Sequence, residues 1–125
     1  MNFKLDWNRT YSYENFINRS TSNTFGIQFK PWGNVECEAH LIFDNDPSAE
    51  NHLVKIITAE EASGMNFTWN NIPNRSYGAH TAELYLTAMI NGNLEKTDSV
   101  FHEITFYGDD TVPILTVPFY QKTAT

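Results

Sequence analysis

Hydrophobic and polar residues alternate along much of this chain, and the alternation predicts β-strands. Residues 25–30 alternate, and we expect this strand of about six residues to stop at Pro31, which has no amide hydrogen for a ladder. Residues 35–43 alternate more regularly, with the odd positions apolar. Their even positions form an opposite face of Glu36, Glu38, His40 and Ile42. No window of a dozen residues shows a convincing helical period, so the chain is predicted to be all-β.

The second half of the chain continues the pattern. Leu53 to Thr58 is β-branched and apolar, and Asn66 to Trp69 is a shorter aromatic run. The segment 59–64 between them fits a loop or one helical turn, and the pattern leaves both open. From Gly78 to Tyr107 two long runs flank Asn91-Gly92, a pair that tolerates positive φ and favours a tight hairpin.

These segments together predict an immunoglobulin-like antiparallel β-sandwich of about seven strands. The stretch 73–78 resembles the corner that precedes the sixth strand of such folds, with Tyr77 as a structural tyrosine. Residues 1–111 are assigned to the sandwich. Residues 112–125 contain two prolines and are either an added edge strand or the start of a following domain.

Size and charge narrow the classes of partner. The chain has 125 residues, enough for one domain and one core. Eight Lys and Arg oppose fifteen Asp and Glu, and this formal charge of −7 predicts no nucleic-acid partner. No stretch approaches the roughly 20 apolar residues of a membrane helix, so no membrane insertion is expected. Cys37 is the single cysteine and falls on an apolar strand face, where we expect an inert thiol.

Five segments resemble immunoglobulin-like repeats in large structural proteins of crAss-like and related gut-bacterial phages: residues 35–37, residues 41–44, residues 77–88, Ile90-Asn91-Gly92 and residues 111–114. The resemblance covers most of residues 1–115. It implies a virion or tail-associated role, in which stacked sandwiches act as spacers and host-contact surfaces. It implies no catalytic residues, and it supports a domain junction near residue 112.

Oxygen-bearing side chains gather after the second strand. Asp44, Asp46 and Glu50 are spaced like ligands of a calcium loop, although the EF-hand pattern is excluded because Ala49 and Lys55 replace its glycine and its bidentate glutamate. The alternative is an ordinary Asx-rich turn. Glu36, Glu38 and His40 project from one strand face, which predicts either a cation site or simply a solvated sheet face.

Exposed aromatic residues are candidates for a sugar-stacking platform, because flat rings present apolar faces to pyranose rings. Trp32 lies in a Pro-Trp-Gly loop and Tyr85 on a polar strand face, and these two are the predicted ligand residues. Trp69 is predicted to be core. The alternative for Trp32 and Tyr85 is that such aromatics cap the end of the sandwich.

The sequence contains no catalytic motif. A Gly-x-Ser-x-Gly elbow, a phosphate loop and a two-histidine zinc-protease spacing are all lacking, so no enzyme and no cofactor are expected, apart from the loop calcium. The chain is predicted to be a structural or adhesive module, and the resemblance to the phage repeats implies that it is located on a virion. Its partners would be proteins, either neighbouring virion subunits or a host-surface receptor. The second hypothesis is a carbohydrate-binding sandwich with glycans as partners.

Overall fold

The computed structural model describes residues 2–8 and 15–110, which form nine β-strands and no α-helix. The all-β prediction is confirmed. The segment 112–125, predicted as an edge strand or a new domain, lies outside the described residues. In chain order the strands are β1 (Lys4–Asp6), β2 (Phe16–Asn18), β3 (Thr24–Trp32), β4 (Cys37–Phe43), β5 (His52–Ile57), β6 (Phe67–Pro73), β7 (Gly78–Ile90), β8 (Asn93–Lys96) and β9 (Val100–Tyr107).

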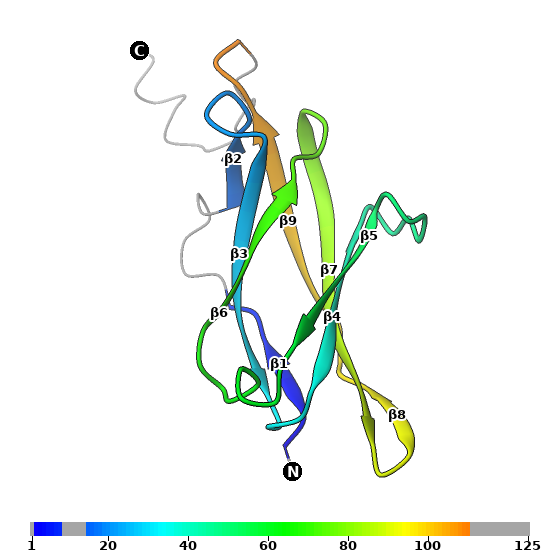
Figure 1. Cartoon of the computed structure of the whole chain (residues 1–125). Coiled ribbons are helices and arrows are strands. Elements are labelled where there is room, and N and C mark those ends of the chain that lie inside the picture. Colours follow the sequence, from blue (N-terminus) through cyan, green and yellow to red (C-terminus); the bar gives the residue numbers. More distant parts are fainter. Residues whose placement is uncertain (1, 9–14, 111–125) are drawn as a thin grey trace, which may run out of the picture.

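The strands make two sheets that pack face to face (Figure 1). One sheet has three strands in the order β1-β3-β6, and the other has six, with the path β2-β9-β7-β4-β5 and β8 beside β7. The long strand β7 is the centre of the larger sheet, because it pairs with β4 on one edge and with β8 and β9 on the other. The hairpin formed by β7 and β8 extends away from the rest of the sandwich (Figure 1).

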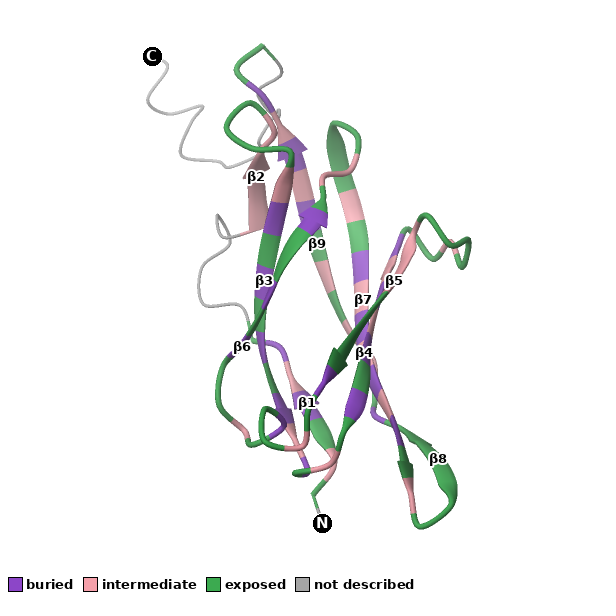
Figure 2. Ribbon diagram, viewed as in Figure 1, coloured by how far each residue is buried: buried purple, intermediate pink, exposed green. Residues whose placement is uncertain are grey.

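The core lies between the sheets and is built from alternate residues of each long strand (Figure 2). Along β4 the burial follows the predicted period of two, so that Ala39, Leu41 and Phe43 are fully buried. Leu84 and Leu86 of β7 are buried in the same way and lie beside β4 in register. Trp69 is also buried, as predicted. Burial of this kind contributes about 25 cal/mol per Å² of apolar surface.

The count of nine strands differs from the predicted seven or so, and the pairing is not wholly antiparallel. The alternation predicted no strand before Phe25, yet β1 pairs with the end of β3 and β2 pairs in parallel with β9. Both strands have only three residues. Such short strands carry too little alternation to be recognised, and their position depends on the edge that they join.

Pro31 does not end β3, contrary to the prediction. The strand continues to Trp32 because β1 pairs with its last residues, with Leu5 opposite Pro31. The Pro31 carbonyl accepts a hydrogen bond from the Gly64 amide at 2.7 Å. The nitrogen and the carbonyl of one strand residue point to the same edge of the strand, so the nitrogen of Pro31 also faces the Gly64 loop. The missing amide hydrogen is therefore on the edge away from β1, and the hydrogen bonds to β1 are intact.

The segment 59–64, left open between a loop and a helical turn, contains one helical turn within a loop. The Ala62 amide donates to the Thr58 carbonyl at 3.0 Å. The Thr58 amide donates to the Glu61 carboxylate at 2.9 Å, and the Glu61 amide donates to the Thr58 hydroxyl at 3.2 Å. This reciprocal pair is a capping box, which satisfies the amides at the start of the turn.

Thr97 marks the irregular point that separates β8 from β9. The register leaves Tyr85 and Leu86 of β7 opposite three residues, 97–99, so the strand opposite β7 bulges. Thr97 is the one buried polar residue among those described. Its amide donates to the Leu86 carbonyl and its hydroxyl accepts from the Leu86 amide, both at 2.9 Å. The side chain thereby replaces a missing ladder bond.

Thr97→Val should therefore destabilise the fold. The substitution keeps the shape but leaves the Leu86 amide without its acceptor, which costs about 1–3 kcal/mol for a buried group. Urea denaturation measures this free energy of unfolding. Thr97→Ser, which keeps the hydroxyl, should retain most of the stability, and equal losses in both variants would contradict the role assigned to this oxygen.

Candidate functional site

The six-stranded sheet has one face turned away from the three-stranded sheet, and we call it the outer face. Strand register places its side chains in cross-strand rows. Val54, His40 and Tyr85 share one row, and Ile42 and Glu83 lie in the next. The face consists of His52, Val54, Ile56, Glu38, His40, Ile42, Glu83, Tyr85, Thr87, Met89, Leu94, Lys96, Phe101 and Glu103.

The outer face carries exposed apolar side chains that the other sheet lacks. The described residues include seven exposed large hydrophobic side chains, and the five that lie on strands all belong to this face: Val54, Ile56, Met89, Leu94 and Phe101. The exposed residues of β3 and β6 are instead Gly26, Gln28, Lys30, Thr68, Asn70, Asn71 and Pro73, and Trp32 at the end of β3 is half-buried. Contiguous exposed apolar side chains mark interaction sites; on the outer face Val54 and Ile56 are neighbours along β5, and Met89 pairs with Leu94.

His40 lies at the middle of the outer face with a partner on each ring nitrogen. Its Nδ1 is 2.9 Å from Nε2 of His52, and its Nε2 is 2.9 Å from the Thr87 hydroxyl. The Glu38 carboxylate is 3.5 Å from the same Nε2. The ring also stacks on Tyr85, with centroids 4.8 Å apart and an interplanar angle of 7°. The imidazole is thus fixed in both position and plane.

These surroundings shift the pKa values of His40 and Tyr85. Burial lowers the pKa of His40 from its ordinary 6.5, the neighbouring His52 lowers it further, and Glu38 opposes the shift. Burial raises the pKa of the Tyr85 hydroxyl, with a smaller effect from Glu83. His40 is therefore held in its neutral form, which can both donate and accept a hydrogen bond.

Tyr85, one of the two predicted sugar-stacking residues, lies on the exposed side of β7, but its ring already contacts other side chains of the protein. His40 stacks on it from the β4 side, and the Lys96 ammonium from β8 lies 4.4 Å from its centroid. Trp32 ends β3 in the other sheet. The structure therefore does not bring the two predicted aromatic residues onto one surface.

Trp32 packs into the loop around Gly64. Its indole nitrogen donates to the Asp6 carboxylate at 3.0 Å, and the Lys4 ammonium lies 4.7 Å from its ring centroid. Gly64 has a φ of 83°, and a Cβ added there would lie 2.6 Å from the ring. These contacts agree with the alternative for Trp32, an aromatic residue that caps one end of the sandwich.

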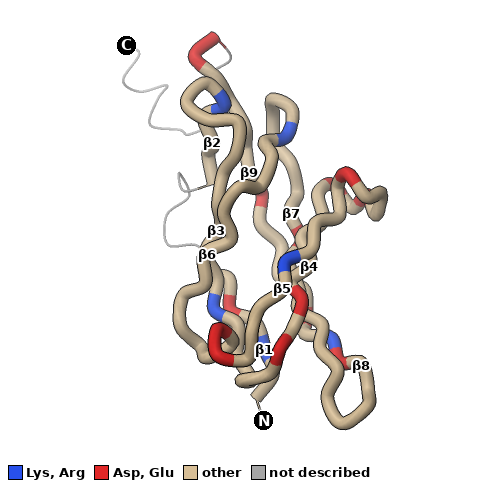
Figure 3. The backbone as a smooth tube through the Cα atoms, in the orientation of Figure 1, with Lys and Arg blue, Asp and Glu red and all other residues tan. Residues whose placement is uncertain are grey.

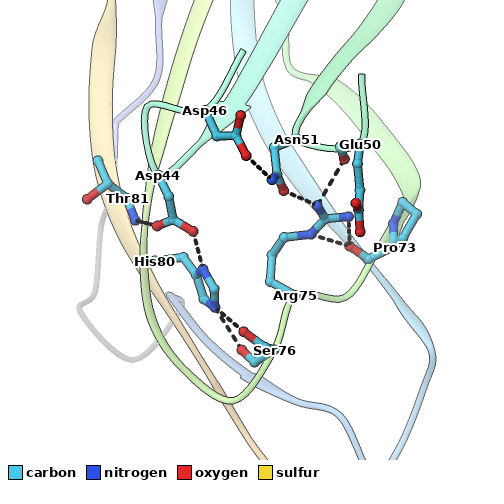
Figure 4. A network of polar contacts seen from close by, with 9 residues as sticks. All are labelled: Asp44, Asp46, Glu50, Asn51, Pro73, Arg75, Ser76, His80 and Thr81. Atoms are coloured by element: carbon cyan, nitrogen blue, oxygen red, sulfur yellow. Dashed lines mark hydrogen bonds and ion pairs between the residues drawn. The ribbon is translucent and has the colours of Figure 1, made fainter. Parts of the chain in front are cut away.

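The predicted calcium ligands fall in a polar network at the turn between β4 and β5 (Figure 4). The Asp44 carboxylate accepts from the Thr81 amide at 3.1 Å and from the His80 ring at 2.6 Å. The Asp46 carboxylate accepts from the Ser48 amide at 3.0 Å and from the Asn51 side chain at 2.8 Å. Each oxygen of both carboxylates thus already has a donor, with which calcium would compete.

Hydrogen bonds from backbone and side-chain donors lower the pKa of Asp46, first those from Ser48 and then that from Asn51. Such an arrangement is an Asx turn, the alternative considered for this loop. The calcium prediction for Asp44, Asp46 and Glu50 stays a prediction. Within the described ranges, no three His, Cys, Asp or Glu side chains gather as a metal site.

Arg75 joins the same loop to the end of β6. Its guanidinium donates to the Glu50 carbonyl at 3.1 Å, to the Asn51 side chain at 2.7 Å and to the Pro73 carbonyl at 3.2 Å (Figure 4). It also lies over the Phe43 ring at 4.8 Å. These groups border a cavity of about 550 Å³ that also reaches His80. With its donors committed, Arg75 acts as a clamp between loops.

Ser76, His80 and Asp44 form an arrangement that no sequence motif revealed. His80 Nδ1 contacts Asp44, and His80 Nε2 lies 3.2 Å from the Ser76 hydroxyl (Figure 4). The order resembles a Ser-His-Asp triad. However, the same Nε2 is 2.8 Å from the Ser76 carbonyl. The Ser76 carbonyl can only accept a hydrogen bond, so it competes with the Ser76 hydroxyl for the same nitrogen, and this geometry favours a structural clip.

A second cavity, of about 530 Å³, lies beside the three-stranded sheet and has a mainly polar lining. Trp7 and His102 stack on one side of it, with ring centroids 3.9 Å apart. The polar lining residues are Asp6, Asn8, Asn15, Gln28, Lys30 and Asn66. Trp7 itself is buried, so its edge and the amide side chains provide the available contacts.

Charge and thiol chemistry add little to the site. Among the residues drawn, acidic and basic positions are scattered along the backbone, and Lys and Arg do not cluster (Figure 3). Cys37 is buried in the core, and burial raises its pKa to about 11, which disfavours the reactive thiolate. No helix within residues 2–8 and 15–110 has the length and apolar character to cross a bilayer.

Comparisons with protein-family models, curated proteins and solved structures find no match to this chain.

His40 predicts a pH dependence of stability. Because the folded state lowers the pKa of this imidazole, the unfolded state binds the proton more readily, and acid favours unfolding. The free energy of unfolding should fall as the pH drops from about 7.5 to about 5 in urea titrations with a chelator present. His40→Gln should flatten this dependence. Wild-type stability that is constant or rises toward acid would contradict the assignment.

Gly64→Ala should destabilise the chain more than Gly92→Ala. Both positions have positive φ, but an added Cβ meets the Trp32 ring only at Gly64, while nothing lies within 4 Å of it at Gly92. The strain of the left-handed backbone, about 1–2 kcal/mol, is common to both. Thermal unfolding of the two variants isolates the Trp32 contact, and equal losses would show that the ring moves aside freely.

Proposed function

We propose that this chain is a non-catalytic, immunoglobulin-like structural or adhesive module, associated with a phage virion or tail, that presents the outer face for assembly or host contact. The observation that carries the proposal is the contrast between the two sheet surfaces. Val54, Ile56 and Phe101 are between 49% and 62% exposed, whereas no large hydrophobic side chain of β3 or β6 is exposed to this degree and most of their exposed residues are polar. Interface cores are depleted in charge and enriched in such side chains.

The strand order supports the immunoglobulin-like part of the proposal. In such folds one sheet holds the first, second, fourth and fifth strands, and the other holds the third, sixth and seventh. Here β1, β3 and β6 correspond to the first, second and fifth strands, and β4, β7 and β9 to the third, sixth and seventh; among the described residues the fourth strand has no counterpart, and β5 is added beside β4 instead. The short parallel strand β2 extends the second sheet beyond β9.

A display role fits the way in which the polar side chains are used. Loops are held to one another by Arg75 and by the contact between Asp44 and His80. In the group that resembles a catalytic triad, Nε2 of His80 lies beside the Ser76 carbonyl. The hairpin of β7 and β8 places Met89 and Leu94 side by side at its extended end. A rigid core with an apolar hairpin suits contact with another protein. The phage assignment rests on the sequence resemblance.

A charge placed on the outer face should disrupt this role. Ile56→Lys or Leu94→Lys, introduced into the gene of the source phage, should lower incorporation of the protein into virions or adsorption to host cells by about tenfold or more, the effect of about 1.4 kcal/mol at an interface. Both side chains are at least 62% exposed, so folding should be retained. Quantitative immunoblots of purified virions and adsorption assays measure the two outcomes.

The matched control is Thr68→Lys, which adds the same charge on the exposed side of β6, away from both cavities. It should leave incorporation and adsorption unchanged. Absence of the chain from purified virions, or equal defects from Thr68→Lys, would contradict the proposal.

A carbohydrate-binding module is the second candidate function. It is supported by the cavity beside the three-stranded sheet, where amide and charged side chains surround the stacked Trp7 and His102. Polar side chains of this kind can hydrogen-bond the hydroxyl groups of a glycan. Glycan-array binding that is lost in Gln28→Ala but retained in Tyr85→Ala would favour this cavity over the surface that the sequence indicated.

A further inference from the structure

Two histidines on neighbouring strands meet at the outer face. His40 lies on β4 and His52 on β5, displaced by one cross-strand row, since His52 pairs with Ile42 and His40 pairs with Val54. Their ring nitrogens Nδ1 and Nε2 are 2.9 Å apart. Both histidines are partly exposed, with the His40 side chain 14% accessible to solvent.

The separation of the two nitrogens fits a shared metal ion. A nitrogen bonds Zn²⁺ or a similar ion at about 2.0–2.1 Å, so two nitrogens at adjacent corners of a square-planar or octahedral shell lie about 2.9 Å apart. The observed 2.9 Å matches that edge. In the absence of metal, the two nitrogens at this distance form a hydrogen bond. To bind an ion, each ring has to rotate so that its nitrogen lone pair points toward the ion and away from the other nitrogen.

The far side of His40 is arranged as the second shell of a metal ligand would be. Its Nε2 lies 2.9 Å from the Thr87 hydroxyl and 3.5 Å from the Glu38 carboxylate. A proton on Nε2 can be donated to these oxygens, which leaves the Nδ1 lone pair for a cation. Stacking on Tyr85 fixes the plane of the ring. Few surface histidines have both restraints.

We propose that His40 and His52 form a two-imidazole site for a divalent late transition-metal ion, with Cu²⁺ bound more tightly than Ni²⁺ or Zn²⁺. The preference follows from the nitrogen donors and the Irving–Williams order. Water completes the coordination shell. The inference is independent of the proposed virion role, since it depends only on the two strands.

The test is titration of the metal-free full chain with Cu²⁺ at about pH 7.5, a pH at which ligating imidazoles are neutral. Isothermal titration calorimetry gives affinity, and electron paramagnetic resonance gives the number of bound imidazole nitrogens. We expect one strong site with two imidazole nitrogens. His40→Gln and His52→Gln should each weaken that site by well over about tenfold, because even an outer-shell change costs about 10–100-fold.

Two further variants separate a metal site from a general loss of structure. Thr87→Val removes the Nε2 partner and should weaken binding by about tenfold while two nitrogens remain bound. His80→Gln changes a histidine held by Asp44 and Ser76 and should leave Cu²⁺ affinity unchanged. The wild-type resonance spectrum needs no variant to fold. Fewer than two imidazole nitrogens at the strong site, or equal affinity in wild type and His40→Gln, would overturn the proposal.

Discussion

The packing of two sheets through alternate residues of their strands is the constraint on which the other features depend. Every long strand gives one set of side chains to the shared core, and Leu41, Leu84 and Phe106 are buried almost completely. Because Cys37 is the single cysteine, no internal disulfide adds to this packing. The period of two has a second consequence: once the inner set is fixed, the outer set is fixed too, and a shift of one residue would exchange the faces. The outer face is thus specified by the core.

The central strand β7 contributes to both the core and the chemistry of the outer face. Its inward residues hold the core, while its outward residues place Tyr85 beside His40 and Thr87 beside the same imidazole. The bulge at Thr97 then separates the return strand into β8, which extends the hairpin, and β9, which completes the sheet. Docking by apolar side chains and metal binding by imidazoles would both use this surface. The proposals share an origin in the register between β4, β5 and β7, but they differ in the side chains that they require.

The sequence was informative where a side chain and its own strand decide the outcome. Alternation identified β3, β4, β7 and β9 and the inward set of each, and Asn91-Gly92 marked the hairpin because few other residues accept positive φ at both positions. Contacts across strands could not be read in this way. The pair His40 and His52, the group of Ser76, His80 and Asp44, and the parallel strand β2 depend on register and sheet order, which alternation does not encode. Pro31 was misread for the same reason, since its effect depends on which edge of β3 has a partner.

Hydrogen exchange of the backbone amides, followed by NMR, tests the central arrangement most directly. The account places β4 and β7 inside the larger sheet with neighbours on both edges, whereas β5 is an edge strand. Amides of β4 and of residues 82–87 of β7, which have a strand on both sides, should therefore exchange slowest at every position, and those of β5 should alternate between slow and fast, because only every second amide faces β4. Uniformly slow exchange in β5, or rapid exchange in the middle of β7, would contradict the strand order and the outer face that follows from it.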